Sequence, residues 1–107
     1  MGNLIKDQRH FLRLFVQTNF TQRKALLDTI TQPQLKALSE IAHNIILGKV
    51  TLTPLERSKL KQKRRFIHLL GNKQLGYKHK QKLVCNKQKI LTLLIKIAIT
   101  YLEAILQ

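Results

Sequence analysis

The segment Thr31-Gln-Pro-Gln-Leu-Lys-Ala-Leu-Ser-Glu-Ile-Ala-His-Asn-Ile-Ile-Leu-Gly48 predicts an amphipathic helix with a signal at each end. Thr31 is a good N-cap, and Gln34, three residues later, completes a capping box. Gly48 marks the end, because glycine tolerates the left-handed backbone conformation found just beyond many helices. The buried stripe of this helix is expected to contain Leu35, Leu38, Ala42, Ile45 and Ile46.

Helix signals recur on both sides of this segment, and strand signals do not. Upstream, the pattern predicts a helix over residues 4–17, and a second that Thr21 caps and that ends at Ile30. Downstream, Thr53-Pro-Leu-Glu56 combines an N-cap, a proline at the first helical position and a capping-box glutamate. This helix is expected to end near Leu70, with Leu60, Ile67 and Leu70 toward the core.

The last 31 residues, from Tyr77 to Gln107, contain no proline or glycine. They predict either one long helix or two helices interrupted at Asn86. A chain of 107 residues is long enough for one small domain. We therefore expect an all-α domain of four to five helices, with a helical N-terminal part (1–48), a basic segment (49–89) and an apolar helix (90–107).

The charge distribution is the feature that bears most directly on function. Thirteen of the twenty Lys and Arg residues lie between Lys49 and Lys89, with Glu56 as the single carboxylate, so this segment carries +12 of the formal +15. Such a density of like charge repels itself and destabilises a compact state unless a polyanion neutralises it. A solvated helix face usually alternates in sign, and this one does not. Nucleic acid is the expected partner, and an anionic membrane surface is the competing one.

The cations expected to contact phosphates fall into two sets. They are Arg57, Lys59, Lys61, Lys63, Arg64 and Arg65, followed by Lys73, Lys78, Lys80 and Lys82. Lys and Arg are sufficient for phosphate contact, but the chain has no motif that would place side chains against base edges. Its aromatic residues are not interleaved with the basic ones, as stacking on single strands would require. The sequence therefore predicts binding of double-stranded DNA that is independent of base sequence.

The apolar tail, residues 90–106, leaves three interpretations open. Its polar residues occupy one narrow stripe of a helix, so the rest must be covered. The tail can complete the core, associate with a second copy or a partner protein, or lie in a membrane interface. The residues that would mediate self-association or partner binding are Ile90, Leu94, Ile97, Tyr101 and Ile105. A membrane is the less favoured partner, because the apolar run is short for a span and includes Lys96 near its middle.

No catalytic constellation is recognisable in the sequence. The five carboxylates are scattered, and the four histidines and one cysteine lack the spacing of a zinc site. Cys85 lies among lysines, which can lower the pKa of a thiol, although an inert thiol is the preferred interpretation. We expect a protein that is not an enzyme and that uses no cofactor or metal.

Several stretches resemble a known family. They are Gln22-Arg-Lys-Ala-Leu-Leu27, Leu38-Ser-Glu-Ile-Ala-His-Asn-Ile-Ile-Leu-Gly-Lys-Val-Thr-Leu-Thr-Pro54, Lys59-Leu-Lys61 and Lys80-Gln-Lys-Leu83. They resemble the small basic proteins of Maverick/Polinton elements and adintoviruses, which are compared with the adenovirus minor core protein X. The resemblance covers residues 20–95 and implies a viral or virus-derived protein that condenses DNA in the host nucleus and in the virion. Residues 86–90 differ from the glycine-glycine-aromatic stretch common in that family.

Two other classes of function fit parts of the same pattern. In the first, the protein is membrane-active, with the basic segment on anionic head groups and the tail in the interface. In the second, it is a protein-interaction adaptor whose basic run serves as a nuclear-localisation signal.

Overall fold

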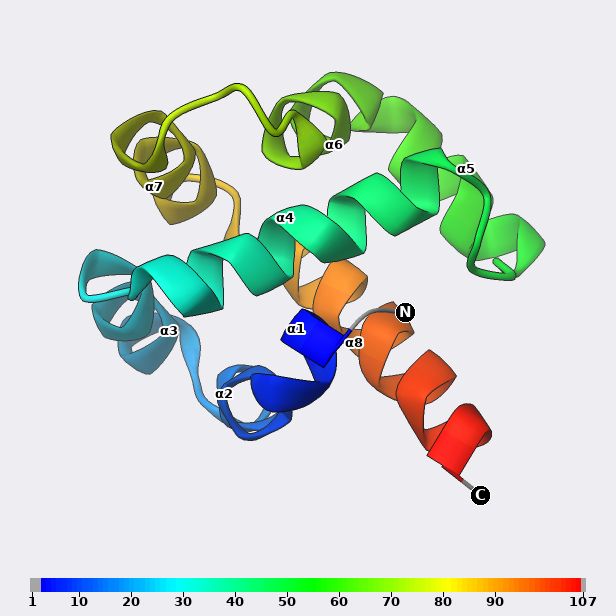
Figure 1. Ribbon diagram of the computed structural model, residues 1–107, viewed down its shortest axis with the longest axis horizontal. Helices are drawn as coiled ribbons and strands as arrows, with labels where there is room; N and C mark the ends of the chain where they lie inside the picture. Colours follow the sequence, from blue (N-terminus) through cyan, green and yellow to red (C-terminus); the bar gives the residue numbers. More distant parts are fainter. Residues whose placement is uncertain (1–2, 107) are drawn as a thin grey trace.

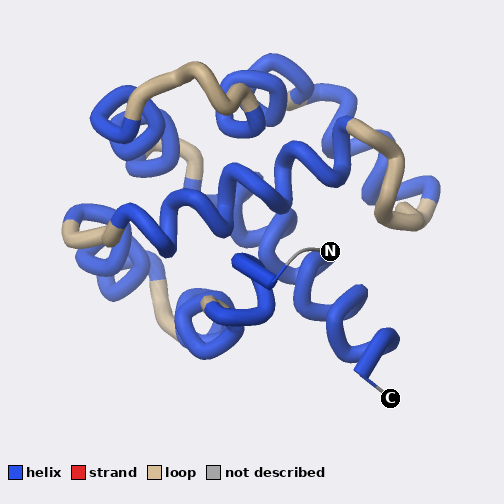
Figure 2. Tube along the Cα trace, in the orientation of Figure 1, coloured by secondary structure: helices blue, strands red, loops and turns tan. Residues whose placement is uncertain are grey.

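The computed structural model describes residues 3–106, and the side chains of residues 3–103. Within that range the chain is all-α, with no strand (Figures 1 and 2). The described helices are α1 (Asn3–Asp7), α2 (Arg9–Gln17), α3 (Phe20–Asp28), α4 (Gln32–Ile46), α5 (Pro54–Gln62), α6 (Arg64–Gly71), α7 (Tyr77–Cys85) and α8 (Gln88–Leu106). The expected all-α class is confirmed, but the described residues form eight helices rather than the expected four to five.

Helix α4 runs across the middle of the molecule and contacts α1, α6, α7 and α8 (Figure 1). Both of its ends form as the sequence predicts. Thr31 Oγ1 accepts a hydrogen bond from the Gln34 amide at 3.2 Å, and the Thr31 amide donates to Gln34 Oε1 at 3.0 Å. At the other end Gly48 has φ +71°, and the Lys49 amide donates to Asn44 C=O at 3.0 Å. This pairing is a Schellman closure, which satisfies carbonyls that the helix leaves free.

One hydrophobic core holds the described residues together. All eight described helices contribute to it, from Ile5 in α1 to Leu102 in α8. The molecule measures 30 × 28 × 25 Å, so its three dimensions are nearly equal. In the α4 stripe, Leu35, Leu38 and Ala42 are buried and Ile45 is half-buried, as expected. The expectation for Ile46 is wrong, because its side chain is 37% exposed.

Two expectations for the N-terminal part need correction. The helix predicted over residues 4–17 is broken at Gln8, whose amide donates to Ile5 C=O three residues back rather than four. On either side of the break, Ile5 of α1 and Phe15 of α2 are both buried in the same core. Thr21 is not a cap. Asn19 caps α3 instead, with its Oδ1 accepting from the Gln22 amide at 2.9 Å.

The predicted basic helix begins as expected at Pro54 but is broken at Lys63 into α5 and α6. Leu60, Ile67 and Leu70 are all buried, as the sequence predicts. The Lys63 amide donates to Leu60 C=O, a tighter turn than an α-helix makes. This turn changes the helix direction, so that α6 packs along α4 while α5 lies at the end of the molecule (Figure 1).

Gly71 allows α6 to approach α4 closely. A Cβ atom at this position would lie 3.1 Å from the backbone nitrogen of His43 and 3.0 Å from Ile46 Cδ1. Those distances are too short for an unstrained contact with a helix backbone. The helix ends at Gly71 with Asn72 as its C-cap, so the predicted end of the basic helix is correct.

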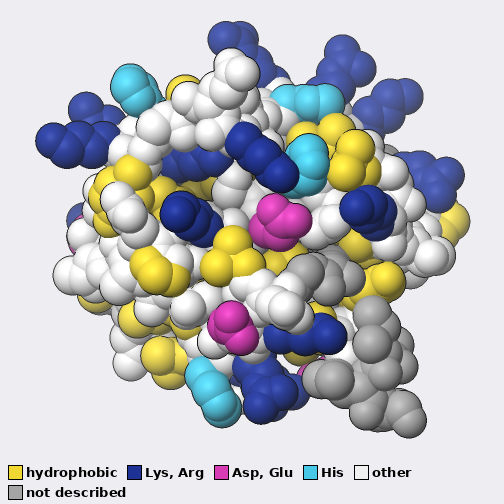
Figure 3. Space-filling model, in the orientation of Figure 1, with side chains coloured by type: hydrophobic (Ala, Val, Ile, Leu, Met, Phe, Trp, Pro, Cys, Tyr) yellow, Lys and Arg dark blue, Asp and Glu magenta, His cyan; other side chains and the backbone are white. Residues whose placement is uncertain are grey.

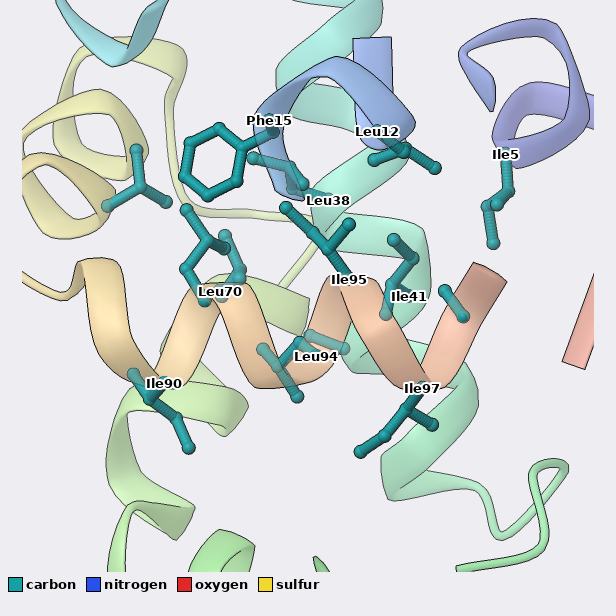
Figure 4. Packing of buried hydrophobic residues seen from close by; sticks show 14 of the residues in the cluster. Ile5, Leu12, Phe15, Leu38, Ile41, Leu70, Ile90, Leu94, Ile95 and Ile97 are labelled. Carbon is teal, nitrogen blue, oxygen red and sulfur yellow. The ribbon is translucent and has the colours of Figure 1, made fainter. Parts of the chain in front are cut away.

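The apolar tail forms α8 and completes the core. Figure 4 shows Ile95 pointing toward Leu38 and Ile41 of α4, while Ile90 and Ile97 leave the other side of the same helix. Both sides are covered, since Ile95 is fully buried and Ile90 and Ile97 are 8% and 4% exposed. Over residues 90–103, its exposed positions, Lys96, Thr100 and Glu103, lie on one stripe, and most of its other described side chains are buried. None of the helices in the described range combines the length and the apolar character needed to cross a membrane.

Most of the residues expected to mediate self-association therefore lie in the core rather than on the surface. Ile90, Leu94 and Ile97 are buried inside a single chain, which leaves little of them for a second copy. Tyr101 is half-buried against the core. Ile105 lies outside the residues whose side chains are described.

Ile97→Asp should abolish or strongly weaken folding of the isolated protein. It would place an unpaired carboxylate in an apolar site, at a cost of several kcal/mol, which is a large part of the stability of a small domain. Circular dichroism during thermal unfolding in lipid-free buffer measures the loss. Thr100→Asp is the matched control, because Thr100 is exposed on the same helix and receives the same charge. If the two variants melt at similar temperatures, α8 is not packed as described.

Candidate nucleic-acid interface

The basic side chains gather on one edge of the molecule. In Figure 3, Lys and Arg side chains project along the upper edge, which Figure 1 shows to be built from α7, α6 and α5. The carboxylates visible on this face lie in its middle and lower part. The edge is continuous because α5 contacts α6 and α6 contacts α7.

Nine of the ten cations predicted to bind phosphates are exposed. They are Arg57, Lys59, Lys61, Lys63, Arg64, Arg65, Lys73, Lys78 and Lys82. Lys49, Lys87 and Lys89 were not singled out by sequence reasoning, but they are exposed as well. The sequence signal that could have identified them is that they belong to the same basic segment, residues 49–89.

These cations have no carboxylate partners among the described residues. The ion pairs found there, Arg13–Glu103 at 3.6 Å and Lys24–Asp28 at 3.7 Å, both lie outside the basic segment. Glu56, the segment's own carboxylate, is used to cap α5, since its Oε1 accepts from the Thr53 amide at 2.9 Å. The positive charge of this edge is therefore left for solvent and for external anions.

Three of the cations share one face. Arg57, Lys61 and Arg64 line a shallow apolar groove of about 230 Å³ between α4, α5 and α6. The groove floor includes Ile45, Leu60 and Ile67, and His68 lies at its rim. The three cations line the same groove although the turn at Lys63 places Arg64 on a different helix from Arg57 and Lys61. Cations gathered in this way can contact neighbouring phosphates of one DNA molecule.

Lys80 is the exception, and its place in the predicted site is wrong. The side chain is 7% exposed, and its ammonium donates to Ser39 Oγ at 2.7 Å. Successive residues on a helix are about 100° apart, so Lys80 faces away from both Lys78 and Lys82. The same spacing could have separated Lys80 from its neighbours, but the sequence does not say which side of α7 faces inward.

Cys85 has no features of a reactive thiol. Burial raises its pKa, and so do the charge of Asp28 and the hydrogen bond from Cys85 Sγ to Asp28 Oδ1 at 3.7 Å. The lysines nearby in sequence do not reverse this shift. Among the described residues, His, Cys, Asp and Glu side chains form no group of three that could hold a metal ion.

The fold and this surface define a small all-α protein with a strongly cationic edge. No protein-family model, curated protein or solved structure matches the chain. The resemblance to small basic viral core proteins thus remains a hypothesis drawn from the sequence.

Thr53→Ala should destabilise the start of the basic edge. Thr53 Oγ1 accepts from the Glu56 amide at 3.2 Å, and loss of an N-cap of this kind costs about 1 kcal/mol. The expected result is a melting temperature a few degrees lower, measured by circular dichroism. Thr51→Ala is the control, because Thr51 is exposed and precedes the helix. Equal melting of the two variants would contradict the described capping box.

Proposed function

We propose that the protein binds double-stranded DNA through its phosphates, without regard to base sequence, and condenses it. The observation that carries this proposal is the edge built from α5, α6 and α7, whose exposed cations have no carboxylate partners within the described residues. A surface of this kind gains free energy from an external polyanion, because binding releases the counterions of both partners.

The chemistry of the surface supports phosphate binding rather than base reading. Lys and Arg predominate on it, and they extend from several short helices instead of one recognition helix. The sequence contains no recognisable groove-reading motif, so the contacts are expected to be with the backbone.

The biological setting of the proposal comes from the sequence resemblance. A small basic protein that condenses DNA fits a genome-packaging core protein of a virus or virus-derived element, acting in the host nucleus and the virion. It is proposed to act without enzymatic activity and without a cofactor.

The membrane alternative is weakened by the position of α8. The apolar residues that would enter an interface, such as Leu94 and Ile97, are buried in the core. Anionic vesicles nevertheless offer the same kind of charge as DNA, so they belong in the test as a separate arm.

The test is a salt titration of affinity for duplex DNA, measured by fluorescence anisotropy. If about six phosphates are neutralised, affinity should fall about a thousandfold between about 50 and 200 mM salt. Duplexes of unrelated sequence should bind equally. Replacing Arg57, Lys61 and Arg64 together by Gln should reduce the salt slope by about three.

A charge-matched control distinguishes DNA binding by this particular surface from binding driven by the net charge of the whole protein. Arg9, Lys24 and Lys96 are exposed and lie outside the basic segment, so their joint replacement by Gln removes the same charge elsewhere. This variant should keep nearly the wild-type slope. Equal losses in both variants, a flat salt response, or tighter co-sedimentation with anionic vesicles than binding to DNA would overturn the proposal.

A further inference from the structure

A pocket of about 540 Å³ opens between α1, the first half of α4, the loop of residues 72–76 and the start of α7. Its volume lies in the range of about 300–1,000 Å³ that is typical of small-molecule sites. The lining residues are Leu4, Gln32, Leu35, Lys36, Ser39, Glu40, Lys73, Leu75, Tyr77 and Lys80. Except for Lys73 and Lys80, none belongs to the predicted DNA-binding set.

The buried ammonium of Lys80 is the central polar group of this pocket. Lys80 is 7% exposed, and its Nζ donates to Ser39 Oγ at 2.7 Å. Ser39 in turn donates to Leu70 C=O at 2.6 Å, so its hydroxyl proton is already used. An ammonium has three N–H donors, and the hydrogen bonds among the described residues account for one of them. Lys80 forms no ion pair with a described carboxylate.

A buried ammonium with one hydrogen bond and no ion pair destabilises the folded state. Removing a charge from water without a compensating partner disfavours the charged form, and burial accordingly lowers the pKa of Lys80. An anion placed beside Nζ would supply the missing partner and would favour the charged ammonium again.

The remaining lining groups restrict the chemistry of such an anion. Lys36 and Lys73 add two exposed cations, and Glu40 is the single carboxylate, so the lining carries a net positive charge. Tyr77 donates its hydroxyl hydrogen to Ile30 C=O, which holds the ring in place at the pocket. The apolar part of the lining comes from three leucines, Leu4, Leu35 and Leu75.

We propose that this pocket binds a small organic anion, with a carboxylate or phosphate head on Lys80 and an apolar body against Leu35 and Leu75. The two heads share the chemistry that Lys80 requires, which is a charged oxygen acceptor. The site shares Lys73 with the DNA-binding edge, but it differs in its anchoring cation, because Lys80 is buried whereas Lys78 and Lys82 are exposed.

Backbone amide NMR of the whole protein tests the proposal with defined probes. Phenyl phosphate and benzoate represent the two heads on one apolar body, phenol lacks the charge, and inorganic phosphate lacks the body. At least one of the two organic anions should give saturable shifts centred on Ser39, Leu75, Tyr77 and Lys80. Phenol and inorganic phosphate should each bind about tenfold more weakly or worse, a difference of about 1.4 kcal/mol. The stronger of the two organic anions identifies the preferred head.

A pair of lysine variants provides the control. Lys80→Met keeps an unbranched side chain, one atom shorter, but removes the ammonium, and it should weaken binding of the preferred anion at least about tenfold. Lys78→Met removes the same charge from an exposed position on the same helix and should change binding less than about twofold. The Lys80 side-chain NMR signal should also show a higher pKa when the anion is bound.

Several results would overturn the proposal. They are shifts spread over the exposed cations of residues 49–89, equal losses in the two lysine variants, and the absence of saturation with either organic anion. If Lys80→Met fails to fold, the wild-type comparison with phenol still decides, since equal binding of charged and neutral probes contradicts a role for the ammonium. DNA affinity of a folded Lys80→Met should be unchanged, so failure of either proposal leaves the other intact.

Discussion

Enclosure of α4 by other helices is the constraint on which the rest of the structure depends. Its apolar side receives Ile95 of α8, and α6 approaches its backbone at Gly71, where an added Cβ would lie 3.1 Å from the backbone nitrogen of His43. With α4 and α8 filling the centre, α5 and α6 turn few positions inward, and these are occupied by Leu60, Phe66, Ile67, Leu70 and Gly71. The remaining positions of α5 and α6 face solvent, and these are the ones that carry cations.

This arrangement accounts for how one small domain tolerates a charge of +15. Repulsion within the basic edge destabilises the fold, and burial of apolar side chains from every described helix in one core offsets it. A bound polyanion would remove that repulsion and so stabilise the folded state by mass action. Lys80 is the instructive exception, because its side chain is buried and its ammonium donates to Ser39 Oγ but forms no ion pair with a described carboxylate.

Local signals in the sequence predicted much of the fold. The capping boxes at Thr31 and Thr53 and the turn at Gly48 depend on residues three or four apart, so the sequence alone contains them. The Asn19–Gln22 box was equally local and was overlooked in favour of Thr21. The breaks at Gln8 and Lys63 were not predictable in this way, since no proline or glycine lies there. Each break lies between residues buried in the same core, Ile5 and Leu12 at the first and Leu60 and Ile67 at the second, and that packing is tertiary information.

The candidate interface, like the fold, was predictable where it depends on local sequence and not where it depends on tertiary packing. Missing counter-charges predicted which segment is cationic, and exposure of nine of the ten chosen residues agrees with that reasoning. The inward direction of Lys80 depends on how α7 packs against α4 and α6, which is tertiary information. The role of the tail was open for the same reason, because an apolar helix looks alike in sequence whether its own chain or another surface covers it.

Lysine footprinting tests the central claim most directly. The free protein and its complex with duplex DNA are acetylated briefly, and modification at each lysine is measured by mass spectrometry. Lys59, Lys61, Lys63, Lys78 and Lys82 should be protected by DNA, whereas Lys24 and Lys96 should stay reactive. Lys80 should react slowly in both samples, because it is buried. Protection of Lys24 and Lys96 without protection of the α5–α7 edge would contradict the account.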